Sequence, residues 1–187
     1  MPYEYGTQEW EDAYRDLVEK RLEEASEPYI SGSPEWLAVF EKLVKEDVQY
    51  KEDAKDWEGS VVLVTLANPE EGLEEDVYLL MDLWHGDCRS IRFVPREVGE
   101  KGDFIISADG RRWRQIREGE LDATKALMQG KMKMRGDLPK VVRSAKATTR
   151  LTELSSSIDV IYPEDMDEAA AEEFDAFFKQ FRADFGI

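Results

Sequence analysis

Cysteine and histidine are nearly absent from this sequence, which contains one residue of each. A single cysteine excludes an internal disulfide bond and is typical of a reducing compartment. One Cys and one His also fall short of the ligand set that a zinc site uses, so we expect no metal. The glycine-rich phosphate loop of nucleotide-binding proteins is missing as well, and we expect no cofactor.

Long hydrophobic runs are also lacking. No apolar stretch approaches the roughly 20 residues that a membrane-spanning helix needs, so no stable membrane insertion is predicted. The N-terminus is acidic and aromatic, which argues against a signal peptide, and the last residues form no peroxisomal address. We therefore expect a cytoplasmic protein. A chain of 187 residues is long enough for a single domain, residues 1–187, with a sizeable core.

Positive charge is scarce except in one block. The net charge is −17, but residues 111–150 hold 12 basic and 4 acidic side chains. The acidic remainder argues against a nucleic-acid partner, because phosphate binding needs a basic footprint. The block itself suits a phosphate, a carboxylate or a charged lipid surface. Pairing of its cations with the acidic remainder is an equally good interpretation.

Hydrophobic periodicity predicts helices and then a sheet. Apolar residues recur at helical spacing in residues 8–26 and 34–57, the second range preceded by Ser33 as an N-cap. The first strand pattern is almost wholly apolar, which suits a strand covered on both faces. Short connections between the strands favour antiparallel hairpins and thus a four-stranded meander. The expected strands are residues 60–67, 76–84, 88–94 and 103–108.

The rest of the chain alternates helices with one further strand. A polar helix at 109–118 and a second short helix lead to a strand at 131–135, with methionines on one face and cations on the other. Its exposed cations suit an edge strand. Helices are expected at 138–156 and 165–185. The last helix carries a stripe formed by Phe174, Phe177, Phe178, Phe181 and Phe185.

The most specific stretch is residues 119–138, which read Gly-Glu-Leu-Asp-Ala-Thr-Lys-Ala-Leu-Met-Gln-Gly-Lys-Met-Lys-Met-Arg-Gly-Asp-Leu. The stretch combines a short helix, a glycine break, a strand of alternating Lys and Met, and a Gly-Asp turn that begins another helix. Placed after several strands, this order resembles the sterol carrier protein type 2 (SCP2-like) lipid-binding domain family. The resemblance covers residues 34–156 and leaves the helices at 8–26 and 165–185 as additions.

The resemblance implies an α+β fold with a five-stranded mixed, mainly antiparallel sheet covered by helices, and an apolar tunnel between the layers. Relatives bind fatty acids, fatty acyl-CoA, phospholipids or sterols there, so we expect a carrier without catalytic residues. Methionine suits such a cavity because it is flexible and polarizable, although methionines also serve as ordinary core filler. The expected tunnel residues are Met128, Met132, Met134, Leu79, Met81, Phe93, Phe104, Ile106, Phe177 and Phe181. From the basic block, an anionic headgroup is expected near Arg111, Arg112, Arg114 and Arg117.

Other interpretations remain open. The chain can be an accessory or interaction subunit of a larger enzyme, since its terminal helices carry apolar stripes that suit a protein partner or a homodimer. His85 and Cys88 lie close together, and a Cys–His pair can form an activated nucleophile, but a plain turn is favoured. The Phe stripe is too apolar to stay in water. We expect it to pack on its own domain, as core or as a movable lid.

Overall fold

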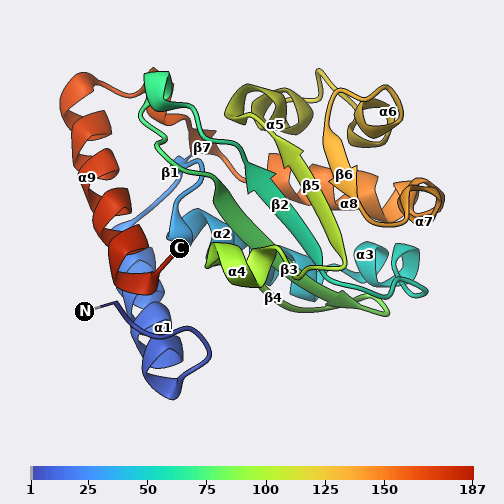
Figure 1. Ribbon diagram of the computed structural model, residues 1–187, viewed down its shortest axis with the longest axis horizontal. Coiled ribbons are helices and arrows are strands. Elements are labelled where there is room, and N and C mark those ends of the chain that lie inside the picture. The colour runs from blue at the N-terminus through green and yellow to red at the C-terminus, as the bar shows by residue number, and fades with distance from the viewer. Residues whose placement is uncertain (1) are drawn as a thin grey trace.

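The protein is built around one mixed five-stranded sheet. The computed structural model describes residues 2–187 and places the strands in the order β4-β3-β2-β5-β6 (Figure 1). β2 and β5 pair in parallel and the other neighbours are antiparallel, which confirms the predicted sheet with the methionine strand at its edge. The strands are β2 Val61–Thr65, β3 Val77–Trp84, β4 Asp87–Val94, β5 Phe104–Ala108 and β6 Lys133–Arg135.

The connection from β4 to β5 shows that the predicted meander is wrong. β5 pairs with β2 instead of β4, so the chain crosses the sheet through the short helix α4 Arg96–Gly99. The crossing lies directly on the strands. It is so close that a Cβ added at Gly99 would collide with the ring of Tyr78, and one added at Gly102 would collide with Val62. Glycine is needed at both positions for this close approach.

Each of two long predicted helices is broken in the middle. In the first, the Asp47 carboxylate accepts a hydrogen bond from Tyr50 N at 2.7 Å and pairs with Arg150 at 2.7 Å. An aspartate that bonds the next turn's backbone starts a new helix, which the apolar spacing alone does not reveal. The second predicted helix breaks at Ser144. The resulting helices are α2 Pro34–Glu46, α3 Val48–Asp53, α7 Leu138–Arg143 and α8 Ala145–Ser156.

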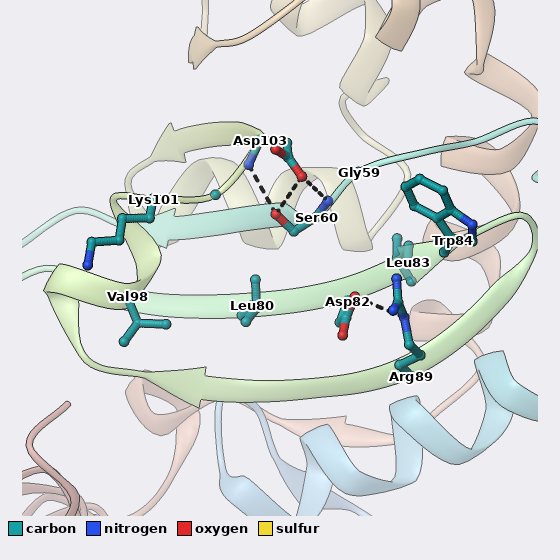
Figure 2. Close-up of a pocket in the computed structure, with 11 residues that line it drawn as sticks. Gly59, Ser60, Leu80, Asp82, Leu83, Trp84, Arg89, Val98, Lys101 and Asp103 are labelled. Atoms are coloured by element: carbon teal, nitrogen blue, oxygen red, sulfur yellow. Dashed lines mark hydrogen bonds and ion pairs between the residues drawn. The ribbon is translucent and has the colours of Figure 1, made fainter. Parts of the chain in front are cut away.

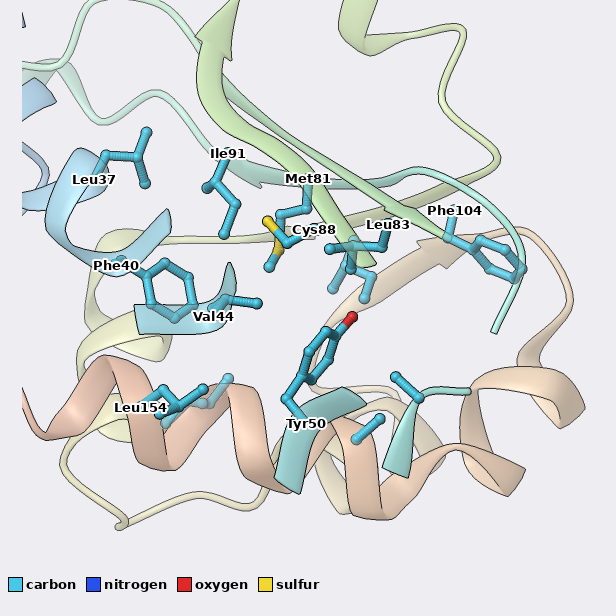
Figure 3. Packing of buried hydrophobic residues seen from close by; sticks show 14 of the residues in the cluster. Leu37, Phe40, Val44, Tyr50, Met81, Leu83, Cys88, Ile91, Phe104 and Leu154 are labelled. Atoms are coloured by element: carbon cyan, nitrogen blue, oxygen red, sulfur yellow. The ribbon is translucent and has the colours of Figure 1, made fainter. Parts of the chain in front are cut away.

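The two faces of the sheet are covered differently. α2 and α8 lie behind the strands in Figure 1, and α4 lies in front. α2 packs closely on β4, whereas the main neighbours of α8 are other helices, namely α2, α3, α5 Gly110–Arg117 and α6 Ala123–Met128. Figure 3 shows Phe40 and Val44 of α2 between the strand residue Met81 and Leu154 of α8. The face under α4 carries a smaller apolar cluster of Val62, Val64, Tyr78, Val94 and Ile105.

The two chain ends form a module of their own, which we call the terminal module. It consists of α1 Gln8–Glu24, α9 Glu168–Phe185, and the parallel pair of β1 Tyr29–Ile30 with β7 Val160–Ile161 (Figure 1). Trp10 Nε1 donates to Phe185 O at 3.1 Å. On β4, the ring centroid of Phe93 lies 5.8 Å from that of Phe178 and 6.0 Å from that of Phe181. The Phe-rich helix therefore packs on its own domain, as predicted.

The terminal module and α2 also close the outer edge of β4. Ile91 N donates to the Glu41 carboxylate at 2.8 Å, and Phe93 N donates to the Tyr14 hydroxyl at 3.2 Å. Arg92 of the same strand pairs with a Glu11 oxygen at 2.7 Å. These side chains occupy backbone donors that would otherwise invite another strand.

Replacing Phe181 with Ala should lower the free energy of unfolding by about 3–5 kcal/mol, the usual cost of truncating a buried phenylalanine. Its side chain is only 1% exposed, so the truncation leaves a cavity between α9 and β4. Equilibrium denaturation of the full-length protein measures the loss. Phe174→Ala is the matched control, because Phe174 lies on the same stripe but is only partly buried, and it should cost less than half as much. Equally small losses for both variants would contradict the docked position of α9.

Candidate functional site

Most of the predicted tunnel residues come together on the helix-covered face of the sheet. The strand register places Leu79 opposite Phe93 and Ile106 opposite Met134. Met81 and Phe104 lie on this face too, because both are paired with Val61 of β2 in the strand register. Met132, just before β6, belongs to the same buried cluster. Six strand residues and one loop residue from distant parts of the chain thus form one apolar surface.

The remaining tunnel candidates lie elsewhere. Met128, the last residue of α6, is 64% exposed and points to solvent. Phe181 is buried in the terminal module, and the guanidinium carbon of Arg21 lies 3.6 Å from the ring centroid of Phe177. Arg21 in turn holds the buried Glu35 carboxylate at 2.7 Å. Phe177 and Phe181 are therefore part of the joint between α1, α2 and α9, at the opposite end of the sheet from Met132 and Met134 (Figure 1).

The central strand β2 is sealed on one face and accessible on the other. Beneath α4, Val62 is 0% and Val64 is 2% exposed. On the helix-covered face of the same strand, Val61 and Leu63 keep accessible surface, as does the neighbouring Leu79 on β3. The helix layer thus covers β2 less tightly than the short α4 does. Val61, Leu63 and Leu79, three side chains that keep accessible surface here, are all apolar.

The four predicted headgroup arginines are not equivalent. Arg114 pairs with Glu118, Glu164 and Asp165 at 3.1, 2.9 and 2.8 Å, and these carboxylates, Asp165 above all, raise the pKa of its guanidinium. For Arg114, pairing with the acidic remainder is therefore the better interpretation. Arg111 and Arg112 form no ion pair within residues 2–187, and Arg111 is exposed.

Arg117 holds the end of α8 and leaves one donor unused. It donates to Tyr162 Oη at 3.2 Å, to Ser155 O at 3.1 Å and to Ile158 O. Its Nε–H is buried and meets no acceptor within the described residues, and the same holds for Nε1–H of Trp36 on α2. The guanidinium carbon lies 6.0 Å from the centroid of the Trp36 ring. Two side chains that each carry a buried donor without an acceptor thus approach each other between α2 and α5.

Sequence reasoning missed Trp36, because its position fits the apolar stripe of α2. The available signal was the indole N–H, since a buried tryptophan usually finds a hydrogen-bond partner. The other tryptophans of the core follow that rule: Trp57 donates to Gly59 O at 2.8 Å and Trp113 to Val64 O at 3.0 Å. Trp36 stacks on Phe40 with 6.0 Å between ring centroids but has no such acceptor among residues 2–187.

A hollow of about 360 Å³ lies on the opposite face of the sheet, beside α4 (Figure 2). Most of its polar side chains already have partners, and Lys101, which forms no ion pair within residues 2–187, is exposed to solvent. Asp103 accepts from Ser60 N at 2.8 Å and Asp103 N donates to Ser60 Oγ at 3.0 Å, while Arg89 pairs with Asp82 at 3.2 Å. The hollow is open to solvent and lacks unpaired buried groups, so it is a poor candidate for a specific site.

The thiol and imidazole do not form a catalytic pair. Burial raises the pKa of Cys88 to about 12, so the thiol stays protonated at neutral pH. His85 Nε2 lies 2.7 Å from the Glu58 carboxylate at the protein surface. Within residues 2–187, no three His, Cys, Asp or Glu side chains are grouped in a way that could hold a metal ion.

Comparison with known proteins identifies the class that this fold defines. A five-stranded sheet with helices over one face is the architecture of sterol carrier proteins, and residues 40–147 match the model of the SCP-2 sterol transfer family. A crystal structure of sterol carrier protein 2 is 31% identical, with a TM-score of 0.60 over 66% of this chain and 95% of the other. The chain therefore belongs to the SCP-2 sterol transfer family.

A second similar structure comes from Thermus thermophilus. It is a conserved hypothetical protein whose description suggests a sterol carrier protein, and it is 30% identical with a TM-score of 0.62 over 69% of this chain and 90% of the other. No curated protein matches the sequence. None of the helices formed by residues 2–187 has the length and apolar character needed to cross a bilayer.

Cys88 should resist modification in the folded protein. Its side chain is 7% exposed and burial raises its pKa to about 12, so the reactive thiolate forms only under strongly alkaline conditions. A chromogenic disulfide reagent at mildly alkaline pH should report almost no reaction until denaturant is added, and then one thiol per chain. Rapid reaction of the native protein at neutral pH would contradict this assignment.

Proposed function

We propose that the protein is a non-catalytic carrier that holds a long-chain apolar ligand with one polar end between the sheet and the helix layer. The observation that carries the proposal is the contrast across β2. Its side chains are sealed under α4 but keep apolar accessible surface under the helices, at Val61 and Leu63. An apolar ligand removes such surface from water, at about 25 cal/mol for each Å² buried. Membership in the sterol transfer family and the names of the similar structures support this class of ligand.

The apolar end of the ligand is expected between β2, β5 and β6. Leu63, Ile106 and Met134 lie side by side there in the strand register, and Leu63 and Met134 are only half-buried. At Met81 of β3 and Ile91 of β4, side chains of α2 already pack on the sheet (Figure 3). Met134 can adapt to chains of different shape, because its side chain is unbranched and flexible.

The polar end is expected at the junction of α2 and α5. Trp36 Nε1–H and Arg117 Nε–H are both donors, and both lack acceptors within the described residues. A group that only accepts hydrogen bonds, such as a fatty-acid carboxylate, satisfies both donors at once and is charge-matched to the guanidinium. Arg111 and Arg112, on the same helix α5, extend the positive charge toward a larger head such as that of a fatty acyl-CoA. The proposed ligand is therefore a fatty acid or its acyl-CoA in preference to a neutral sterol.

The accessory-subunit alternative depends on a free apolar surface on the terminal helices. Phe178 and Phe181 lie against Phe93 of the same chain, and Phe185 lies against Trp10. These side chains are occupied within the domain, so they do not favour a partner subunit over a carrier.

The test is binding of a fluorescent long-chain fatty acid to the wild type and to Trp36→Phe. The substitution keeps an aromatic ring and removes the donor, so affinity for the fatty acid should fall about tenfold or more, the usual effect of losing a hydrogen bond to a charged group. A neutral apolar dye should bind both proteins equally. Trp84→Phe is the matched control, because Trp84 is exposed on the β3–β4 hairpin, and it should leave both affinities unchanged.

The outcomes separate the parts of this proposal. If the wild type binds neither probe, the carrier function is wrong. If it binds the fatty acid but Trp36→Phe binds equally well, the carrier function stands and the polar end lies elsewhere.

A further inference from the structure

The cations of residues 125–146 differ from most of those in the rest of the molecule. This range holds seven basic side chains and one acidic one, and we call the seven the basic corner: Lys125, Lys131, Lys133, Arg135, Lys140, Arg143 and Lys146. Within residues 2–187, none of them forms an ion pair, although eleven other Lys and Arg side chains of the chain do. The one acidic group, Asp137, accepts from Lys140 N at 3.1 Å as the cap of α7. None of these seven cations is therefore neutralised by an ion pair within the described residues.

The basic corner lies at one end of the molecule and the negative charge is concentrated at the other. α6, β6 and α7 occupy one end of the longest axis, and α1 and α9 occupy the opposite end (Figure 1). Residues 1–33 and 157–187, which contain the terminal module, together hold 18 acidic and 5 basic side chains. A negatively charged surface therefore attracts one end of the protein and repels the other.

An exposed apolar side chain lies within the basic corner. Met128 is 64% exposed at the end of α6, with Lys125 one turn before it and Lys131 three residues after it. Both lysines are exposed. An apolar side chain flanked by cations fits the boundary between lipid headgroups and acyl chains, where the cations meet phosphates and the thioether leaves water.

We propose that the basic corner docks on an anionic membrane surface, with Met128 entering the headgroup region and the terminal module pointing away. The inference rests on the proposed function, since a carrier must exchange its ligand with a lipid phase. Attraction to anionic lipid falls off within a Debye length, about 10 Å at 0.1 M salt. Only the charges of the nearest end therefore contribute, which is how a protein with a net charge of −17 binds such a surface.

The experiment is co-sedimentation of the full chain with phosphatidylcholine vesicles, with and without phosphatidylserine, at low and high salt. The wild type should bind only the anionic vesicles and should be released by high salt. The affinity of the variant Lys125→Glu/Lys131→Glu for these vesicles should be lower by a factor of about ten or more, because each cation near the surface contributes substantially to the attraction. The matched control is Lys20→Glu/Lys42→Glu. These lysines are exposed, lie outside the basic corner and form no ion pair within residues 2–187, so the net charge changes equally and binding should stay within about twofold of the wild type.

Met128→Trp tests which residue enters the membrane. Its emission, compared with that of the wild type under the same conditions, should shift to the blue with anionic vesicles and should be more strongly quenched by lipids brominated near the headgroup. No shift and no quenching would overturn the placement of Met128.

Several results would overturn docking itself: no binding to anionic vesicles, equal binding to neutral vesicles, or equal losses in the corner and control variants. Light scattering tests one alternative. If the protein associates with itself in a salt-dependent way and does not bind vesicles, the basic corner binds the acidic end of a second copy. The fatty-acid probe separates the two proposals. If the protein binds the probe but not the vesicles, docking alone is contradicted. If it binds the vesicles but not the probe, docking stands and the carrier function is contradicted.

Discussion

The parallel pairing of β2 with β5 is the constraint on which the rest of the structure depends. Parallel neighbours cannot be joined by a tight turn, so the chain leaves β4, crosses the sheet through α4 and enters β5 beside β2. Gly99 and Gly102 let this crossing lie directly on Tyr78 and Val62, which seals the central strand β2 on that face. The longer helices cover the other face, where α8 is held mainly by other helices. The unequal covering of the two faces, on which the proposed site depends, is thus a consequence of topology.

The position of α8 depends in turn on α5. Arg117 donates to Ser155 O near the end of α8, and Arg114 pairs with Glu164 and Asp165 just beyond it. Both arginines thus hold the segments around the end of α8 in place. At the same junction, Trp36 Nε1–H and Arg117 Nε–H have no acceptors among the described residues. A buried donor left unpaired costs about 1–3 kcal/mol. These two donors at one junction are the observation on which the proposed polar end of the ligand rests.

The sequence predicted what depends on local pattern and missed what depends on distant partners. Alternation located the inward residues of β3 and β5, such as Leu79 and Ile106, and the Lys-Met strand was correctly placed at an edge. The meander was wrong because short connections look alike whether they form a hairpin or a crossover. Only the contacts of Gly99 and Gly102 with other strands distinguish the two.

The candidate site was predictable to the same extent. Met132 and Met134 follow from strand alternation, but Met128 was grouped with them by sequence proximity and lies outside, since it ends a helix instead of lying in the strand. The basic block likewise combined Arg114, which is used in ion pairs, with cations that have none. Spacing identifies residue types, whereas the partner of each charge depends on the folded chain. Trp36 was missed because its position fits the apolar stripe of α2, and spacing does not reveal whether an indole N–H has an acceptor.

The charge asymmetry arises largely from the segments outside the region that matches the family model. Residues 40–147 hold 22 acidic and 19 basic side chains, so most of the net charge of −17 comes from the chain ends. The terminal module contacts the core through apolar rings and closes the edge of β4, and neither role requires acidic residues on its outer surface. Its negative charge does, however, give the molecule two electrically opposite ends. A core with the same basic corner but without this module would lack the repulsion that opposes an approach by the acidic end. The module therefore adds orientation to binding, which a carrier needs if its ligand must enter and leave through one end of the fold.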